Sequence, residues 1–209
     1  MVNRHRALTM AMVGASALFL QGCTGAFSGS GGGDVSVVST TQNTRLDFNF
    51  RTAAYSYLDE NTADLYFTDL SVDQIEALLA GQPRSQIAPE GAQLLHVHLF
   101  LVPRAGRTPI DFAASNITMT HIVLSGEGIG VYGGGGFLLP SRLFALEPGG
   151  SRFGGTMRDA TLRFVTGSRG FTDRIDSGVI GGSLSARLDP PLARQINALI
   201  DELVRGAAD

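Results

Sequence analysis

The chain has 209 residues, and its 16 basic residues, all of them arginine, are outnumbered by 19 acidic ones, which gives a formal net charge of −3. A chain of this length fits one domain once any targeting segment is removed. The acidic balance argues against a nucleic-acid partner, because domains that bind nucleic acid carry a clear basic excess on one face.

The first 22 residues are predicted to be a signal peptide. Arg4 and Arg6 form a short basic start, and residues 7–20 form an uncharged, largely apolar run. This run is shorter than the roughly 20 residues that a membrane-spanning helix needs, but it suits the core of a secretory signal.

The signal ends in LQGC, Leu20 to Cys23, which holds the only cysteine of the chain. This ending resembles the lipobox of bacterial lipoproteins, although Gln21 is a less usual residue at its place. The resemblance covers this segment alone, and it implies that Cys23 becomes the N-terminus and carries acyl chains such as palmitate. Thr24 stands where enterobacterial lipoproteins of the inner membrane carry aspartate, so the resemblance implies an outer-membrane location in the cell envelope. The alternatives are an ordinary secretory signal with an unpaired thiol, and an uncleaved membrane anchor.

Glycine and serine dominate the segment from Thr24 to Asp34, a composition typical of a flexible tether. We therefore expect the lipidated cysteine and its tether to occupy residues 23–34 and a single globular domain to occupy residues 35–209. The membrane, reached through the lipid anchor, is the first partner that this organisation implies.

Most of the remaining chain alternates between apolar and polar residues, the pattern of half-buried strands. In residues 45–51, for example, Leu46, Phe48 and Phe50 face one way and polar residues face the other. Further strands are predicted at residues 54–58, 63–70, 92–104, 116–125, 151–159, 160–167 and 178–189.

Two helices are also predicted. The first lies within residues 71–83, where Ser71 and Gln74 fit a capping box. The second is amphipathic, begins after the N-cap Asp189 and ends at Gly206. Together the elements predict a mainly β (α+β) fold: an antiparallel β-sandwich-like domain with one short internal helix and a C-terminal amphipathic helix.

The sequence GVYGGGGFLLP, residues 130–140, reads as a glycine-rich loop. It overlaps a G-x-G-x-x-G match, but a dinucleotide site needs a helix to begin there, and four consecutive glycines make a poor helix. A Walker-type phosphate loop is excluded because the chain has no lysine. Two interpretations remain: close packing of strands, or the rim of a ligand pocket formed by Tyr132, Gly133, Gly134, Gly135, Gly136 and Phe137.

Three histidines form the one constellation with metal chemistry. His96 and His98 lie two residues apart on a predicted strand and so share a face, and His121 lies on the next strand. If the strands pair and the imidazoles converge, they match the three-histidine set with which zinc activates a water molecule. The competing interpretation is that they are polar members of a partly buried face, because Leu94 and Phe100 share it.

No G-x-S-x-G nucleophile motif is present, and the only cysteine lies at the predicted anchor, so we expect no catalytic activity. The sequence thus predicts a lipid-anchored cell-envelope protein with a binding or structural role and an envelope protein, a glycan or a lipid as partner. The alternatives are a metal-binding protein or metal-dependent hydrolase using the histidines, and a small-ligand carrier with its pocket at the glycine run.

Overall fold

A computed structural model describes residues 31–104, 115–141 and 147–208. The predicted signal peptide, Cys23 and residues 24–30 of the predicted tether lie outside the described residues.

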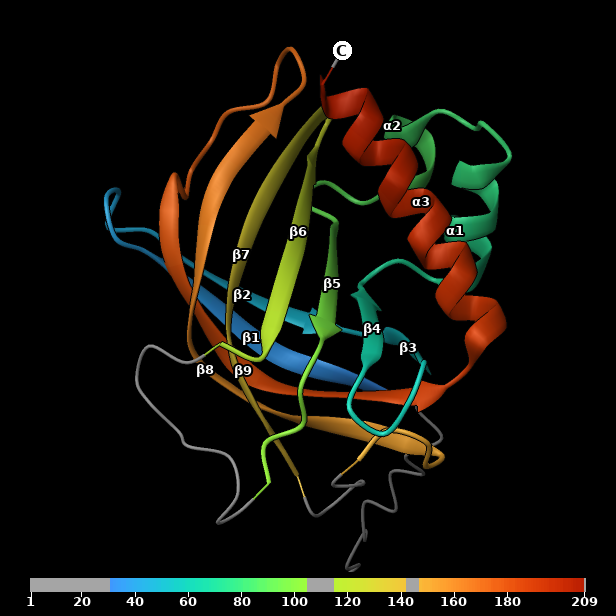
Figure 1. Ribbon diagram of the computed structural model, residues 1–209. Coiled ribbons are helices and arrows are strands. Elements are labelled where there is room, and N and C mark those ends of the chain that lie inside the picture. The colour runs from blue at the N-terminus through green and yellow to red at the C-terminus, as the bar shows by residue number, and fades with distance from the viewer. Residues whose placement is uncertain (1–30, 105–114, 142–146, 209) are drawn as a thin grey trace, which may run out of the picture.

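Nine strands of the described chain form one sheet with the order β2-β1-β9-β3-β4-β5-β6-β7-β8. Neighbouring strands pair antiparallel, except for a short parallel contact between β3 and β9. The strands are β1 (Gly31–Ser39), β2 (Arg45–Phe50), β3 (Thr52–Tyr57), β4 (Ala63–Thr68), β5 (Gln93–Leu99), β6 (Ile117–Ser125), β7 (Gly128–Pro140), β8 (Arg152–Gly167) and β9 (Ser177–Leu188). Because β8 also pairs with β9, the sheet closes on itself into a barrel-like shape, called the barrel below (Figure 1).

The predicted mainly β class with a C-terminal helix is therefore confirmed. The two-layered sandwich is not confirmed, because a single sheet curls round and supplies both walls of the core. Alternation of side chains along strands is the same in a sandwich and in a barrel, so the sequence pattern does not separate the two folds.

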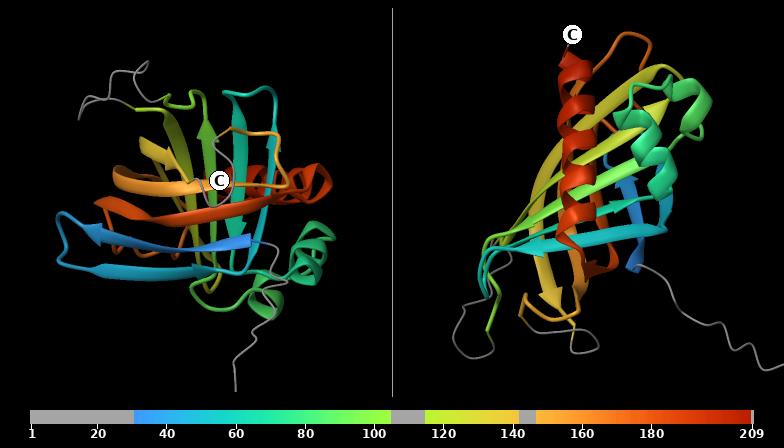
Figure 2. Two further views of the ribbon diagram at one scale, coloured as in Figure 1. Left: turned by 90° about the horizontal axis from the view of Figure 1, so that it is seen from below. Right: turned by 90° about the vertical axis from the view of Figure 1, so that its right-hand side faces the viewer.

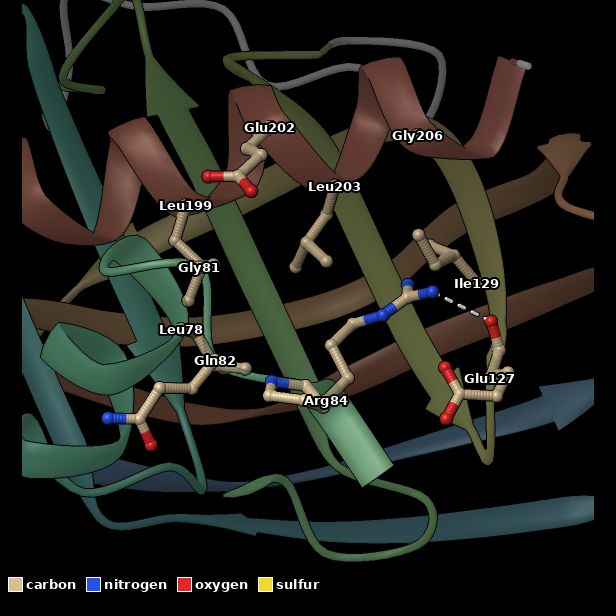
Figure 3. A pocket seen from close by; sticks show the side chains of 11 residues that line it. Leu78, Gly81, Gln82, Arg84, Glu127, Ile129, Leu199, Glu202, Leu203 and Gly206 are labelled. Atoms are coloured by element: carbon tan, nitrogen blue, oxygen red, sulfur yellow. Dashed lines mark hydrogen bonds between the residues drawn. The ribbon is translucent and has the colours of Figure 1, made fainter. Parts of the chain in front are cut away.

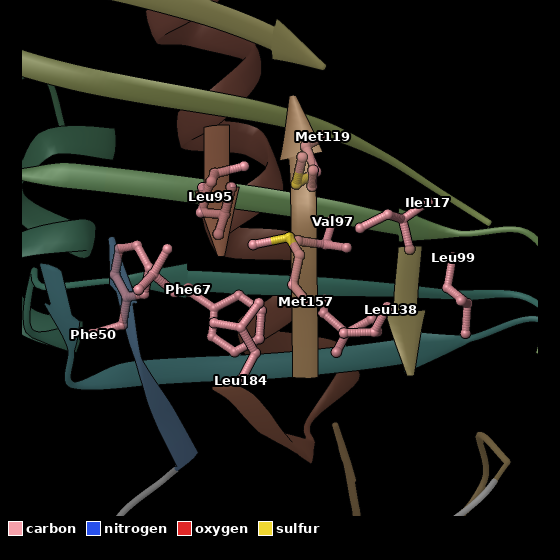
Figure 4. Packing of buried hydrophobic residues seen from close by; sticks show 14 of the residues in the cluster. Phe50, Phe67, Leu95, Val97, Leu99, Ile117, Met119, Leu138, Met157 and Leu184 are labelled. Carbon is pink, nitrogen blue, oxygen red and sulfur yellow. The ribbon is translucent and has the colours of Figure 1, made fainter. Parts of the chain in front are cut away.

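Inward-facing side chains fill the barrel. Strand β5 shows the alternation: Leu95, Val97 and Leu99 point inward, and the residues between them point outward. Figure 4 shows the packing at the centre of the barrel, where the labelled side chains are Phe50, Phe67, Leu95, Val97, Leu99, Ile117, Met119, Leu138, Met157 and Leu184. Since these side chains are buried against one another, the interior is a packed core.

Three helices accompany the barrel: α1 (Val72–Leu79), α2 (Arg84–Ile87) and α3 (Pro190–Ala208). Apolar faces of α1 and α3 form a second core with the outer face of strands β3 to β7 (Figures 1 and 2). The predicted capping box is present, with Ser71 Oγ accepting from Gln74 N at 3.2 Å and Gln74 Oε1 accepting from Ser71 N at 2.9 Å. Within the described residues, no helix has the length and hydrophobicity needed to span a membrane.

Strand β1 begins at Gly31, four residues before the expected start of the domain. Residues 31–34 pair with residues 183–186 of β9, so this part of the glycine-rich segment belongs to the sheet and not to the tether. The glycines are needed there for close packing, because a Cβ at Gly33 would press against the Ser183 carbonyl oxygen and the Leu184 side chain.

The prediction of a glycine-rich loop at residues 130–140 is wrong, because these residues belong to strand β7. A Cβ at Gly134 would collide with the carbonyl oxygen of Thr161, and one at Gly136 would collide with Ala160, both on β8. The strand register shifts between Gly135 and Phe137, so this stretch includes a bulge. Close approach of two strands, the first of the two interpretations of the run, explains these glycines.

Candidate functional site

The three histidines do not converge. Strands β5 and β6 pair as expected, but His121 stands opposite Leu95 and therefore points into the barrel, whereas His96 and His98 point outward. Within the described residues, no group of three or more His, Cys, Asp or Glu side chains is arranged to hold a metal ion. The sequence shows which residues of one strand share a face, but it does not show how two strands align with each other. A shift of one residue in that alignment moves a side chain to the opposite face of the sheet, so whether His121 converges with His96 and His98 could not be predicted.

A carboxylate from β4 joins the two outer histidines. Asp64 Oδ1 lies 2.8 Å from His96 Nε2 and 2.8 Å from His98 Nδ1. Since a carboxylate oxygen only accepts, both of these imidazole nitrogens donate to it. Burial opposes ionisation of Asp64, but the hydrogen bonds from the two histidines outweigh it and hold the pKa of Asp64 below its ordinary value.

Tyr66 ties this cluster to the C-terminal helix. Its ring stacks on His96 with a centroid distance of 4.6 Å and an interplanar angle of 7°. Its hydroxyl donates to Asn197 Oδ1 of α3 at 3.2 Å, and burial together with the nearby Asp64 raises the pKa of Tyr66. The result is a fixed, partly exposed polar patch on the outer wall of the barrel.

His121 has a different environment. Its Nε2 donates to Gln93 Oε1 at 2.7 Å, and its Nδ1 is buried with no hydrogen-bond partner in the described part of the chain. Phe48 and Tyr132 flank the imidazole with ring centroids at 5.2 and 5.9 Å. Complete burial lowers the pKa of His121 to about 4, so the ring is neutral near pH 7.

The predicted pocket rim lies within the wall of the barrel. Tyr132 points inward, where its hydroxyl donates to Asp173 Oδ1 at 2.6 Å, and burial followed by this bond raises the pKa of Tyr132. Gly133, Gly134, Gly135, Gly136 and Phe137 continue the strand between β6 and β8. None of these six residues lines the groove described next.

A groove of about 360 Å³ opens between α1, α2, the β6–β7 turn and the C-terminal half of α3 (Figure 3). Its apolar wall consists of Leu78, Ile129, Leu199 and Leu203. Its polar side chains are Gln82, Arg84, Glu127 and Glu202. Its volume lies at the lower end of the range of small-molecule sites, and its lining has about as many polar as apolar side chains.

Arg84 supplies the unusual feature of this groove. Its Nη2 donates to the carbonyl oxygen of Glu127 at 2.8 Å, and its Nη1 is buried with no hydrogen-bond partner in the described part of the chain. Figure 3 shows the guanidinium between Ile129 and Leu203. A buried donor without an acceptor costs about 1–3 kcal/mol, and more when it is charged, so an anionic group that accepts from Nη1 would be bound favourably.

Sequence reasoning did not single out Arg84 or Asp64. Arg84 lies in an ordinary polar stretch, and the short helix α2 that carries it has no apolar periodicity. Asp64 reaches the histidines only through the register that sets it opposite His98. Both sites depend on contacts between segments that are distant in sequence.

Neither a protein-family model, nor a curated protein, nor a solved structure matches the chain.

Proposed function

We propose that the chain is a lipid-anchored protein of the bacterial cell envelope, held at the outer membrane through Cys23, with a binding role. Its binding site in this proposal is the groove at Arg84. The observation that carries the proposal is the buried guanidinium nitrogen without a partner, set among apolar walls. A group of this kind is expensive to leave unsatisfied, and a bound anion satisfies it.

The ligand that fits this chemistry is a small amphiphile with one anionic group. A carboxylate or phosphate oxygen accepts from Arg84, and a short alkyl portion lies in the groove beside Leu78, Leu199 and Leu203, whose side chains are already largely buried in the second core. Glu127 and Glu202 are exposed and also line the groove, where their carboxylates disfavour a second negative charge and favour a hydroxyl or amine on the ligand. The chemistry is shared by fatty acids and by lysolipids with a single phosphate.

The binding proposal is tested with octanoate and octanol, which differ in charge and share the alkyl chain. The protein begins at Thr24 and is made without lipid. Octanoate should bind more tightly than octanol by calorimetry, and Arg84→Gln should weaken octanoate binding by about 10-fold to 100-fold, because a charge-assisted hydrogen bond contributes about 1.5–3 kcal/mol.

Arg194→Gln is the matched control, since Arg194 is an exposed arginine of α3 outside the groove and the change removes the same charge. Equal affinity for octanoate and octanol, or equal losses in the two variants, would show that Arg84 does not select an anion. Octanol affinity should be the same in all three proteins.

The anchor is tested separately by Cys23→Ala in the full chain. We expect the parent to incorporate labelled palmitate and to float with membranes, and the variant to incorporate none. Palmitate labelling that persists in the variant would remove Cys23 as the lipidation site.

A further inference from the structure

One end of the barrel, called the entry end, is where the described chain begins. Strand β1 starts at Gly31, which pairs with Ala186 near the end of β9, and the next residue of β9, Arg187, pairs with Arg152 at the start of β8. The same end carries the β3–β4 turn, the segment after β5 and the end of β7, at the lower side of Figure 1.

Exposed apolar side chains gather at the entry end. Of the eight large hydrophobic residues that are exposed in the described chain, five lie there: Tyr57, Leu58, Phe100, Leu101 and Leu139. Leu58 is the most exposed of them, at 82 %. Single exposed apolar residues are ordinary, but several at one end of a molecule indicate a surface that contacts something apolar.

Some of the charged residues at this end are held by contacts within the chain. Arg104 Nη2 lies 2.8 Å from Glu60 Oε1 and 3.3 Å from Glu147 Oε1. Asp59 folds back onto its own turn, where Oδ1 accepts from the backbone N–H groups of Asn61 and Thr62 at 2.7 and 2.8 Å. Arg152 and Arg187 also face each other across β8 and β9 at this end, so a basic pair accompanies the apolar residues, and uncharged vesicles are needed to isolate the apolar contribution.

The length of chain before Gly31 decides what lies near this end. Only seven residues separate Cys23 from Gly31 in the sequence. An extended chain covers at most about 3.6 Å per residue, so a lipid on Cys23 keeps Gly31 within roughly 30 Å of the bilayer. A lipid on Cys23 therefore keeps the entry end within reach of the bilayer surface.

We propose that the entry end of the barrel lies against the lipid bilayer, with Leu58, Leu101 and Leu139 at the level of the headgroups and upper acyl chains. The inference rests on the lipid anchor of the proposed function and names the bilayer as the partner of this surface. The barrel then has a fixed orientation, since its tether and its apolar end both face the membrane. Interfacial binding of this kind buries apolar side chains to a depth of about 5–10 Å.

The chain has no tryptophan, so one introduced tryptophan reports on its own position. We would prepare Leu58→Trp and Leu139→Trp in the full, lipidated protein and reconstitute them in uncharged phosphatidylcholine vesicles with brominated acyl chains. The matched control is Val165→Trp: Val165 is 63 % exposed and lies two residues before the end of β8, away from the entry end. Bromine quenches tryptophan only at short range, so quenching measures contact with acyl chains.

Tryptophan at residues 58 and 139 should be quenched several-fold more strongly than tryptophan at residue 165, at low and at high salt. Adding Leu58→Ser and Leu101→Ser to the Leu139→Trp protein should reduce the quenching, because the remaining apolar side chains hold this end in the bilayer. Equally weak quenching of all three reporters would overturn the proposal. It would also be overturned if residues 58 and 139 were buried against a second copy of the protein and their tryptophans were not quenched by the brominated lipid.

The experiment distinguishes failure of the proposed lipid anchor from failure of the proposed orientation. A protein that carries lipid and floats with the vesicles, but shows no quenching at residues 58 and 139, keeps the anchor and loses the orientation. A protein without lipid that stays in the aqueous fraction loses the anchor itself.

Discussion

His121 is the side chain through which pH acts most directly on the core. Burial lowers its pKa to about 4 in the folded chain, whereas a histidine in an unfolded chain titrates near 6.5. Between these values the unfolded state binds a proton that the folded state does not bind. The contribution of the neutral His121 to the stability of the folded state is therefore fully present above about pH 6.5. It is lost as the pH falls toward 4, by roughly 3 kcal/mol in all.

Urea unfolding at pH 7, 5.5 and 4.5 measures this effect. The parent should lose stability across this series, and His121→Leu should lose clearly less, because the variant has no proton to take up at this position. His96→Gln is the control, since His96 is partly exposed on the outer face. An unchanged pH profile in His121→Leu would contradict the assigned role of burial.

At the scale of elements, the contact of β7 with β8 depends on glycine. Gly134→Ala should destabilise the protein by about 1–3 kcal/mol, because its Cβ would collide with the rigid backbone of Thr161. At Gly133 the nearest atom to an added Cβ is Val165 Cγ2 at 3.1 Å, the end of an exposed side chain. Gly133→Ala should therefore destabilise the protein much less than Gly134→Ala. Thermal unfolding of both variants measures the difference, and equal losses of stability would contradict the role given to the β7–β8 contact.

The elements also show what sequence reasoning can reach. The capping box at Ser71 and the N-cap at Asp189, whose Oδ1 accepts from Leu192 N at 3.1 Å, are local and were predicted correctly. The prediction of a loop at residues 130–140 is wrong because the glycines are required by the close approach of β8, a strand distant in sequence, where Gly134 pairs with Leu162. Residues 31–34 were misread as tether for the same reason, since their partners lie on β9.

The candidate sites follow the same division. The sequence places His96 and His98 on one face of a strand, and the structure agrees. It does not reveal Asp64 beside them, His121 on the opposite face or the buried nitrogen of Arg84, since each depends on register or on helix packing. Alternation specifies faces within a strand, and tertiary contacts specify which faces meet.

At the scale of the whole molecule, closure of the sheet decides where a ligand can bind. The barrel interior is packed with apolar side chains, so the groove and the polar patch lie on its outer wall. Strand β2 pairs only with β1 in the described chain, and it carries the exposed ion pair of Arg45 with Asp47. Charges of this kind on an edge strand discourage pairing with other chains.

Helix α3 runs from the entry end to the C-terminus at the opposite end of the molecule, as the right-hand view of Figure 2 shows. It begins at Pro190, directly after β9, and the groove reaches Gly206 near its other end. At 1.5 Å per residue, the groove residues of α3, from Leu199 to Gly206, lie about 14–24 Å from Pro190 along the helix axis. A barrel that rests on the bilayer by its entry end therefore raises the groove well into the surrounding water. A dissolved molecule reaches Arg84 without crossing the headgroups, whereas a membrane lipid must leave its leaflet completely to do so.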